Sequence, residues 1–354
     1  MHSSFRQRRG EAGRDRPITD RHTGAEAFLG FLRVMSQNPV TAERWGLVTY
    51  VVDDDPRERV GLLSAGNTVC ALPELSDYEG LMPAIQHWSD VSSVLGDLDP
   101  RRHEPVLKSR VLSPLRYPRK ILCAGANYWS HLSEMGATVE PGVLDPYFFL
   151  LPATTVVGPG ESIEVPIDDQ AKVDWEGELA VVIGEYARNI SVERAPACVA
   201  GYTICNDVTA RGLHRRSSYA TTPFEWDWLG SKGRDTFLPI GPSVTPSWLV
   251  DNPHDLRLRV WVNGVLKQDA RTSDLIVNVW QLVAAASSVV TLEPGDVITT
   301  GTPAGVGAPR GEFLRPGDVV TVEVESLGQL SNPVRAETES RVVLESVHAA
   351  DVES

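Results

Sequence analysis

Two glutamates, Glu176 and Glu178, stand at the start of a strongly apolar run that ends at Ile183. If this run forms a β-strand, residues two apart lie on one face, so both carboxylates point to the same side. Such a pair repels unless a positive group lies between its members, and a bound divalent cation meets that need. The competing interpretation is a solvated pair on an edge strand, where charged side chains are common.

A third carboxylate, Asp207, closes a second apolar run at residues 201–206. Three carboxylates without a cluster of cysteines and histidines describe a hard, oxygen-rich site. That chemistry suits Mg²⁺, with Mn²⁺ or Ca²⁺ as alternatives, and does not suit a structural zinc ion. Because Mg²⁺ usually keeps several waters, it leaves coordination positions for a chelating substrate.

His131 and Glu134 form a second candidate pair, after a short apolar run at residues 121–123 and a turn that contains Gly125. A spacing of three places both side chains on one face of a helical turn. A carboxylate beside an imidazole orients the ring and supports its positive form, as a general base for water requires. The spacing alone describes an ordinary surface pair equally well.

Two cations and one loop complete the candidate residues. Arg211 lies four residues after Asp207, and Lys232 lies in the segment 229–239. Beside a metal and an anionic substrate, either cation could bind a carboxylate or stabilise a developing enolate; elsewhere each is a surface charge. The Gly/Pro-rich loop 300–307 could turn backbone N–H groups and the Thr302 hydroxyl toward a ligand, or could be a tight turn.

Short strands must position these residues. From residue 120 onward, strand-like runs at 178–183, 260–262 and 319–324 alternate with Gly- and Pro-rich turns, and one helix is predicted at 277–290. Many short strands with few helices predict a mostly-β domain with some helix and a closed or folded-over sheet. We place this catalytic domain at residues 116–348.

The first third of the chain differs in character. Strand-like runs at 45–52, 60–64 and 68–72, with a turn at 65–67, and a helix at 77–95 predict a smaller α+β domain at residues 25–115. The segment 97–118 holds four prolines and many charges, as a linker does. An apolar stripe predicts a further helix at 25–35 for the core or an interface. Residues 1–24 carry six arginines and indicate a disordered basic arm.

Composition narrows the function classes. The chain has 354 residues and a formal net charge of −14, a charge that repels phosphate, so nucleic-acid binding is not expected. Its apolar runs are too short to span a bilayer, and residues 1–24 lack the apolar centre of a secretory signal, so no membrane association is expected. Four cysteines without a C-x-x-C pair indicate a reducing, cytoplasmic setting.

Taken together and in this order, six segments resemble the fumarylacetoacetate hydrolase family, over about residues 118–344. They are the segments 125–136, 156–160, 174–184, 206–211, 232–242 and 300–307. The resemblance implies a mixed β-roll, usually paired as a homodimer. Members hydrolyse C–C bonds in diketo acids, decarboxylate oxo-acids, or hydrate and isomerise unsaturated oxo-acids. The first domain resembles the variable N-terminal region of longer members only loosely.

The resemblance also implies roles for individual residues. It assigns the chemistry to six of them: the metal ligands Glu176, Glu178 and Asp207, the general-base pair His131 and Glu134, and Lys232, which polarises the substrate. It places five more at or near substrate contacts: Tyr128, Arg211, His214, Thr236 and Thr302. The aromatic-rich segment 212–229 is expected to shape the substrate site.

Two positions depart from the family pattern. Leu151 stands where the family often has a lysine, which removes a cation near the ligand. His214 stands where many hydrolytic members carry glutamine, and its imidazole could replace the hydrogen bonds of the amide or indicate different chemistry.

Three functions compete. The leading hypothesis is a metal-dependent hydrolase of a small acylpyruvate-like acid, in which His131 and Glu134 activate water and the metal and Lys232 stabilise the enolate. The second hypothesis keeps the same site for decarboxylation, hydration or isomerisation of an oxo-acid. The third is a catalytically silent binding protein, which has no need of this charge cluster. The residues do not name the substrate or the metal used in the cell.

Overall fold

The alternation of short apolar runs with turns produces a fold built mostly of β-strands, with few helices, so the predicted fold class is confirmed. The computed structural model describes residues 44–64, 67–96, 98–137 and 145–338. The basic arm expected at 1–24, the helix expected at 25–35 and part of the turn at 65–67 lie outside these residues.

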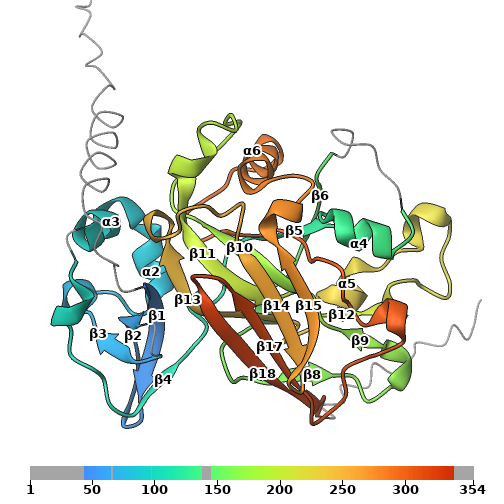
Figure 1. Cartoon of the computed structure of the whole chain (residues 1–354), viewed down its shortest axis with the longest axis horizontal. Helices are drawn as coiled ribbons and strands as arrows, with labels where there is room; N and C mark the ends of the chain where they lie inside the picture. The colour runs from blue at the N-terminus through green and yellow to red at the C-terminus, as the bar shows by residue number, and fades with distance from the viewer. Residues whose placement is uncertain (1–43, 65–66, 97, 138–144, 339–354) are drawn as a thin grey trace, which may run out of the picture. The chain divides into compact units, whose positions relative to one another are not determined.

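Within the part of the chain that the structure describes, the largest sheet has eleven strands. Nine follow one another in the order β3-β2-β1-β13-β11-β10-β16-β5-β6, with β4 beside β1 and β7 beside β13 (Figure 1). Parallel pairs, β16 with β5 and β13 with β7, make the sheet mixed. The strands are β1 Trp45–Val52, β2 Asp55–Ser64, β3 Val69–Ala71, β4 Ser109–Val111, β5 Ile121–Gly125, β6 Tyr147–Leu150, β7 Val156–Val157, β10 Gly177–Ile183, β11 Val199–Asn206, β13 Leu238–Pro246 and β16 Val297–Thr299.

A five-stranded sheet in the order β15-β14-β17-β18-β8 accompanies it, and a two-stranded sheet pairs β12 with β9. The strand runs expected at 319–324 and 260–262 are β17 and part of β14. The remaining strands are β8 Ile163–Val165, β9 Val173–Asp174, β12 Thr209–Ala210, β14 Arg257–Val262, β15 Val265–Arg271, β17 Val319–Val324 and β18 Gly328–Ala336.

The described helices are short: α2 Leu81–Gln86, α3 Trp88–Gly96, α4 Trp129–Glu134, α5 Trp228–Lys232 and α6 Val279–Val289. The single helix expected at 77–95 is in fact the pair α2 and α3, because His87 takes φ −113° and ψ 35° and ends α2. The helix expected at 277–290 is α6. It begins after Asn278, whose side chain and that of Gln281 cap each other's backbone N–H groups.

Strand β10 lies at the centre of this arrangement and is buried on both faces. Leu179, Val181 and Ile183 pack into one core with β14, β17 and α6, whereas Ala180 and Val182 pack into a second core with α2 and α3. Gly177 lies so close to the five-stranded sheet that a Cβ there would stand 2.3 Å from Val260. This two-sided burial explains the uninterrupted apolar run in the sequence.

The first part of the described chain shares this sheet. Strand β1 pairs antiparallel with β13, with Leu47 opposite Val244, and β4 pairs antiparallel with the last residues of β1, with Tyr50 opposite Val111. The proline-rich segment therefore contains a strand, and Leu115 after it is fully buried. The domain boundary near residue 115 stays a prediction.

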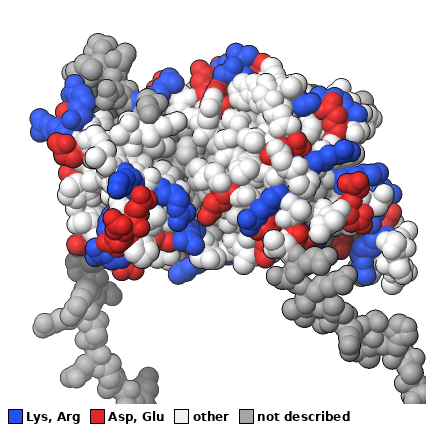
Figure 2. Space-filling model, turned by 90° about the horizontal axis from the view of Figure 1, so that it is seen from below, with Lys and Arg blue, Asp and Glu red and all other residues white. Residues whose placement is uncertain are grey.

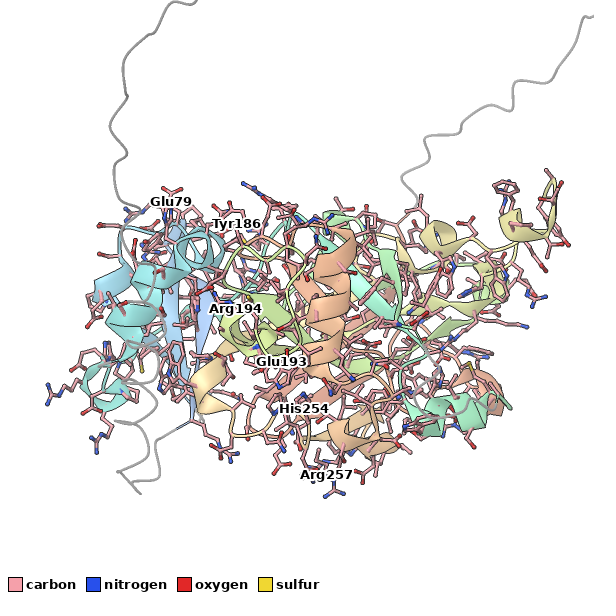
Figure 3. The ribbon with its side chains drawn as sticks, turned by 90° about the horizontal axis from the view of Figure 1, so that it is seen from above. Glu79, Tyr186, Glu193, Arg194, His254 and Arg257 are labelled. Carbon is pink, nitrogen blue, oxygen red and sulfur yellow. The ribbon has the colours of Figure 1, made fainter. Side chains whose placement is uncertain are left out.

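One face of the described protein carries charges of both signs (Figure 2). On the face drawn in Figure 2, lysine and arginine side chains lie interspersed with aspartate and glutamate. Within the described residues, no helix combines the length and the apolar character that a bilayer crossing needs. His254 packs edge-on against Trp280 of α6, with 5.1 Å between ring centroids (Figure 3).

Candidate active site

The three carboxylates expected to bind a metal do meet. Glu176 lies just before β10, Glu178 is the second residue of β10, and Asp207 follows β11 directly. The register of β10 and β11 sets Gly177 opposite Asn206, and the N–H of Asp207 donates to the Glu176 carbonyl at 2.9 Å. One carboxylate oxygen of each lies within 4.8 Å of those of the other two, and all three side chains are buried.

Two cations hold this carboxylate cluster, which we define as Glu176, Glu178 and Asp207. The Lys232 ammonium is buried and donates to Glu176 Oε2 at 3.0 Å, to the Asp207 carbonyl at 3.0 Å and to Asp207 Oδ2 at 2.7 Å. An ammonium has three N–H donors, so all of them are directed at the protein's own oxygens. Arg211 donates to Glu176 Oε1 at 2.5 Å.

A fourth buried carboxylate, Asp174, was not among the predicted site residues. Its oxygens accept hydrogen bonds from Arg211 Nε at 3.0 Å and from the backbone N–H groups of Trp175, Gly307 and Ala308. Asp174 therefore orients the guanidinium that reaches Glu176. A signal was present in the sequence, since acidic residues alternate at 174, 176 and 178, as side chains on one face of a strand do.

The negative and positive side chains at the site are unequal in number. Four buried carboxylates face two cations. Burial, together with the charges of Asp207 and Glu176, raises the pKa of Glu178 well above its usual value. Burial also raises the pKa of Asp207 to about 6, although Lys232 opposes the rise. Burial works in the same direction on Glu176, but Lys232 and Arg211 outweigh it and lower its pKa to about 2.

The donor set fits a hard divalent cation. Asp207 Oδ1 is buried without a hydrogen-bond partner, which is costly for a charged oxygen unless a cation binds it. All the converging atoms are carboxylate oxygens, the ligands that Mg²⁺ and Mn²⁺ prefer. A divalent cation would also offset the excess of two negative charges among the four carboxylates and two cations. Glu176, Glu178 and Asp207 would hold it.

The metal-free protein should lose stability as the pH rises from about 4.5 to about 6. Asp207 has a raised pKa in the folded state, so its stabilising contribution is present at low pH and is lost as the pH rises through about 6. Glu178 acts in the same direction. Glu176 has a lowered pKa, so its contribution is already complete above its usual value of 4.5 and stays constant in this window.

Thermal unfolding of metal-free protein at several pH values measures this trend. The Asp207→Asn variant is the control, because its amide cannot ionise and the fall in stability with pH should be shallower. Equal slopes for the variant and the wild type would contradict the prediction.

Loop 300–308 binds the site's own carboxylates. Gly301 N–H donates to Glu178 Oε2 at 2.6 Å, and Gly305 N–H donates to both oxygens of Glu134 at 3.1 and 3.2 Å. Gly305 has φ +105°, and a Cβ there would stand 2.2 Å from a backbone carbonyl, so the loop needs glycine at this position. These N–H groups therefore orient the carboxylates of Glu178 and Glu134, whereas the sequence suggested N–H groups that face a ligand.

The histidine–glutamate pair lies next to this cluster. His131 Nδ1 is 3.5 Å from Glu134 Oε2 on α4, and both side chains are largely buried. The positive form of His131 is close enough to lower the pKa of Glu176, after the larger effects of Lys232 and Arg211. His131 Nδ1 has no hydrogen-bond partner, so Glu134 acts on the ring through its charge at this distance.

Two of the predicted substrate contacts, Thr302 and Thr236, hydrogen-bond to other parts of the protein, whereas Tyr128 does not. The Thr302 hydroxyl donates to the Gly177 carbonyl and accepts from Gln268, both at 2.9 Å. Thr236 accepts a hydrogen bond from the Glu164 N–H and lines a cavity of about 420 Å³ whose lining does not include the carboxylate cluster. Tyr128 is fully buried and its hydroxyl has no hydrogen-bond partner.

Comparison with known proteins shows where this site belongs. The sequence pattern of the fumarylacetoacetate (FAA) hydrolase C-terminal domain matches residues 120–335, more than half of the chain. The chain belongs to the fumarylacetoacetate hydrolase family. It is an enzyme of this family, and its mixed sheet is the family's fold.

Three relatives bear on the function. An oxaloacetate tautomerase from Xenopus laevis is 37% identical over 315 residues, which cover 85% of this chain and 93% of the relative. The structure of a fumarylacetoacetate hydrolase from Exiguobacterium antarcticum is 32% identical with a TM-score of 0.71, over 83% of this chain and all of that one. The structure of a maleylpyruvate hydrolase from Sphingobium, with manganese and pyruvate, is 25% identical with a TM-score of 0.65, over the same shares of the chains.

The two departures from the family pattern have different surroundings. Leu151 is buried in the same apolar core as Phe149. A lysine at this position would need a partner for its charge, whereas the leucine side chain only fills space. His214 meets Trp228 and Trp226 edge-on, at 4.4 and 5.1 Å between centroids. Burial, together with the charges of Lys232 and Arg211, lowers the pKa of His214 to about 4, so the ring is neutral at pH 7.

Replacing Asp174 should lower the free energy of unfolding without removing a predicted metal ligand. Asp174→Ala leaves Arg211 Nε and three backbone N–H groups without their acceptor, and breaking such a buried pair costs about 3–5 kcal/mol. Urea unfolding of metal-free protein measures the loss. The control is Glu185→Ala, which breaks a solvent-exposed ion pair with Arg194 and should change little. Equal effects of the two substitutions would show that Asp174 is not a structural support.

Proposed function

We propose that this enzyme moves a proton at the carbon beside the carbonyl of a small 2-oxo acid, as a divalent-metal-dependent keto–enol tautomerase. The observation that carries the proposal is the His131–Glu134 pair, held by Gly305 next to the buried carboxylate cluster. A base beside a hard-metal site is all that enolisation of a chelating oxo-acid needs. The 37% identity with an oxaloacetate tautomerase over nearly its whole length supports this reaction.

Each residue of the site has a separate role in this proposal. When bound by Glu176, Glu178 and Asp207, the cation would supply Lewis-acid chemistry that draws electrons from the substrate's carbonyl. His131 Nε2 takes the proton from the adjacent carbon, and Glu134 stabilises the resulting imidazolium. Returning the proton to the oxygen or to the carbon completes the exchange between keto and enol forms. Lys232 acts through its charge and by orienting Glu176 and Asp207, because its three donors are already directed at them.

Hydrolytic C–C cleavage, favoured by the sequence, is the second candidate. The same His131–Glu134 pair could deprotonate a water, and the maleylpyruvate hydrolase supports this possibility at 25% identity. Hydrolysis needs a water held against the distal carbonyl in addition to the groups that enolisation needs. We therefore rank it below tautomerisation.

Product analysis separates the candidates. Purified enzyme with Mg²⁺ is mixed with oxaloacetate or an acylpyruvate in D₂O and followed by NMR. Tautomerisation leaves the carbon skeleton intact and exchanges the C3 hydrogens faster than buffer does, hydrolysis yields two acids, and decarboxylation releases CO₂. No exchange above that of a His131→Ala variant on either substrate would reject the tautomerase proposal.

We further propose that the enzyme is a homodimer located in the cytoplasm. The family resemblance supports pairing, and exposed apolar side chains at the start of β15, Val265 and Leu266, and of β17, Val319, offer a surface for it. Light scattering at micromolar concentration should give twice the chain mass or a multiple of it, and a monomer would contradict the prediction. The Xenopus relative is named as mitochondrial, so cell fractionation must decide the location.

A further inference from the structure

Helix α4 carries both residues of the proposed acid–base pair, yet it cannot hold itself in place. It has six residues, and its N-cap residue, Tyr128, makes no capping hydrogen bond through its side chain. A helix this short is marginal on its own, so contacts from other segments must fix it. The position of His131 therefore depends on what fastens α4.

One fastening comes from the segment before α6. Asn127 accepts hydrogen bonds from the N–H groups of Ile276 and Val277, and Tyr128 forms a β-bridge with Leu275. Asp274, the residue before Leu275, continues these contacts into α4. Its Oδ2 accepts from the N–H of Ser130 at 3.1 Å and from the Ser130 hydroxyl at 2.5 Å.

A second fastening joins the same serine to the site loop. The Ser130 hydroxyl accepts a hydrogen bond from the N–H of Ala304 at 3.3 Å, and the next residue, Gly305, donates to Glu134. The first turn and the last residue of α4 are thus bound to neighbouring residues of one loop. The same loop holds Glu178 through Gly301.

We propose that Asp274 is a positioning residue, which caps the first turn of α4 through Ser130 and so holds His131 against the metal site. This inference rests on the tautomerase or hydrolase function proposed above, since both use His131 as the base. Asp274 touches neither the carboxylate cluster nor the reacting atoms, and it acts by geometry. Small misplacements of a base can cost about a hundredfold in rate, so a loosened α4 should lower kcat.

Three variants test the proposal. Asp274→Ala removes the acceptor, Asp274→Asn keeps one oxygen that can accept both hydrogen bonds, and Asp255→Ala removes an exposed aspartate paired with Arg271 as a matched control. Asp274→Ala should lower kcat by about ten- to a hundredfold with little change in KM or in Mn²⁺ affinity. Asp274→Asn should stay within about threefold of the wild type, because the geometry survives, and Asp255→Ala should be unchanged.

Hydrogen exchange gives a readout that does not depend on turnover. The amides of Leu132 and Met135 are bonded within α4, to Tyr128 and His131, and both should exchange about tenfold faster or more in Asp274→Ala. Both should exchange at nearly the wild-type rate in Asp274→Asn. If the wild-type enzyme turned over no oxo-acid, the proposed function would fail while this comparison would still decide the role of Asp274.

Three results would overturn the proposal. One is wild-type kcat and exchange in Asp274→Ala. Another is an Asn variant as impaired as the Ala variant, because the hydrogen-bond geometry would then not be what matters. The third is a loss of activity in Asp274→Ala that is accompanied by lost Mn²⁺ affinity or by general unfolding, which would indicate a structural role only.

Discussion

Removing divalent cations with a chelator will abolish turnover, and adding Mg²⁺ or Mn²⁺ will restore it. The physical reason is the carboxylate cluster: its oxygens converge, Asp207 Oδ1 is buried without a partner, and two cations face four carboxylates. Without a metal, these residues alone cannot stabilise an enolate, because negative charge would develop beside negative charge. Turnover after dialysis against a chelator, and after stepwise return of each metal, measures the effect.

A ligand variant separates metal binding from folding. Glu178→Ala should lose Mn²⁺ affinity, measured by calorimetry, while metal-free protein stays folded, because the change also removes a buried charge that Asp207 and Glu176 repel. The control is Glu185→Ala at the surface, which should bind Mn²⁺ as the wild type does. Full turnover by rigorously metal-free enzyme would end the metal-dependent interpretation.

Replacing His131 with alanine should lower turnover by about 10²–10⁴, the usual contribution of a general base. Metal binding should survive, because His131 is not among the proposed ligands. Glu134→Gln should cost less, since the amide still accepts from Gly305 but no longer stabilises the imidazolium. The measurements are kcat and kcat/KM on the true substrate, with metal content determined in parallel.

A second histidine variant is the control for a loss of turnover that comes only from lost side-chain packing. Among the described residues, His254 packs against Trp280 and has no hydrogen bond or ion pair with a residue of the proposed site, so His254→Ala should retain turnover even if it loses some stability. Near-wild-type turnover by fully metallated His131→Ala would reject proton transfer by this residue. It would favour decarboxylation, in which the metal supplies most of the enolate stabilisation.

Much of the site could be predicted from residue types and spacing. Acidic residues at i and i+2 before an apolar strand indicate a shared face because strands alternate sides, and that inference needs no tertiary contact. The strand-like runs expected at 45–52 and 319–324 match β1 and β17, and α6 begins two residues after the start of the helix expected at 277–290. The prediction of one helix at 77–95 was wrong because no residue type marks the break at His87.

The sequence by itself determined which chemistry is available: hard carboxylate ligands, an imidazole–carboxylate pair and two cations. Only the tertiary structure decided what these groups contact. It directs all three donors of Lys232 to Glu176 and Asp207, makes Asp174 the acceptor for Arg211, and turns the N–H groups of loop 300–308 toward the site's acids. Such contacts join residues up to 174 positions apart, as between Ser130 and Ala304. They depend on strand register and loop conformation, which are set by packing of the whole core and not by the residues within the motifs.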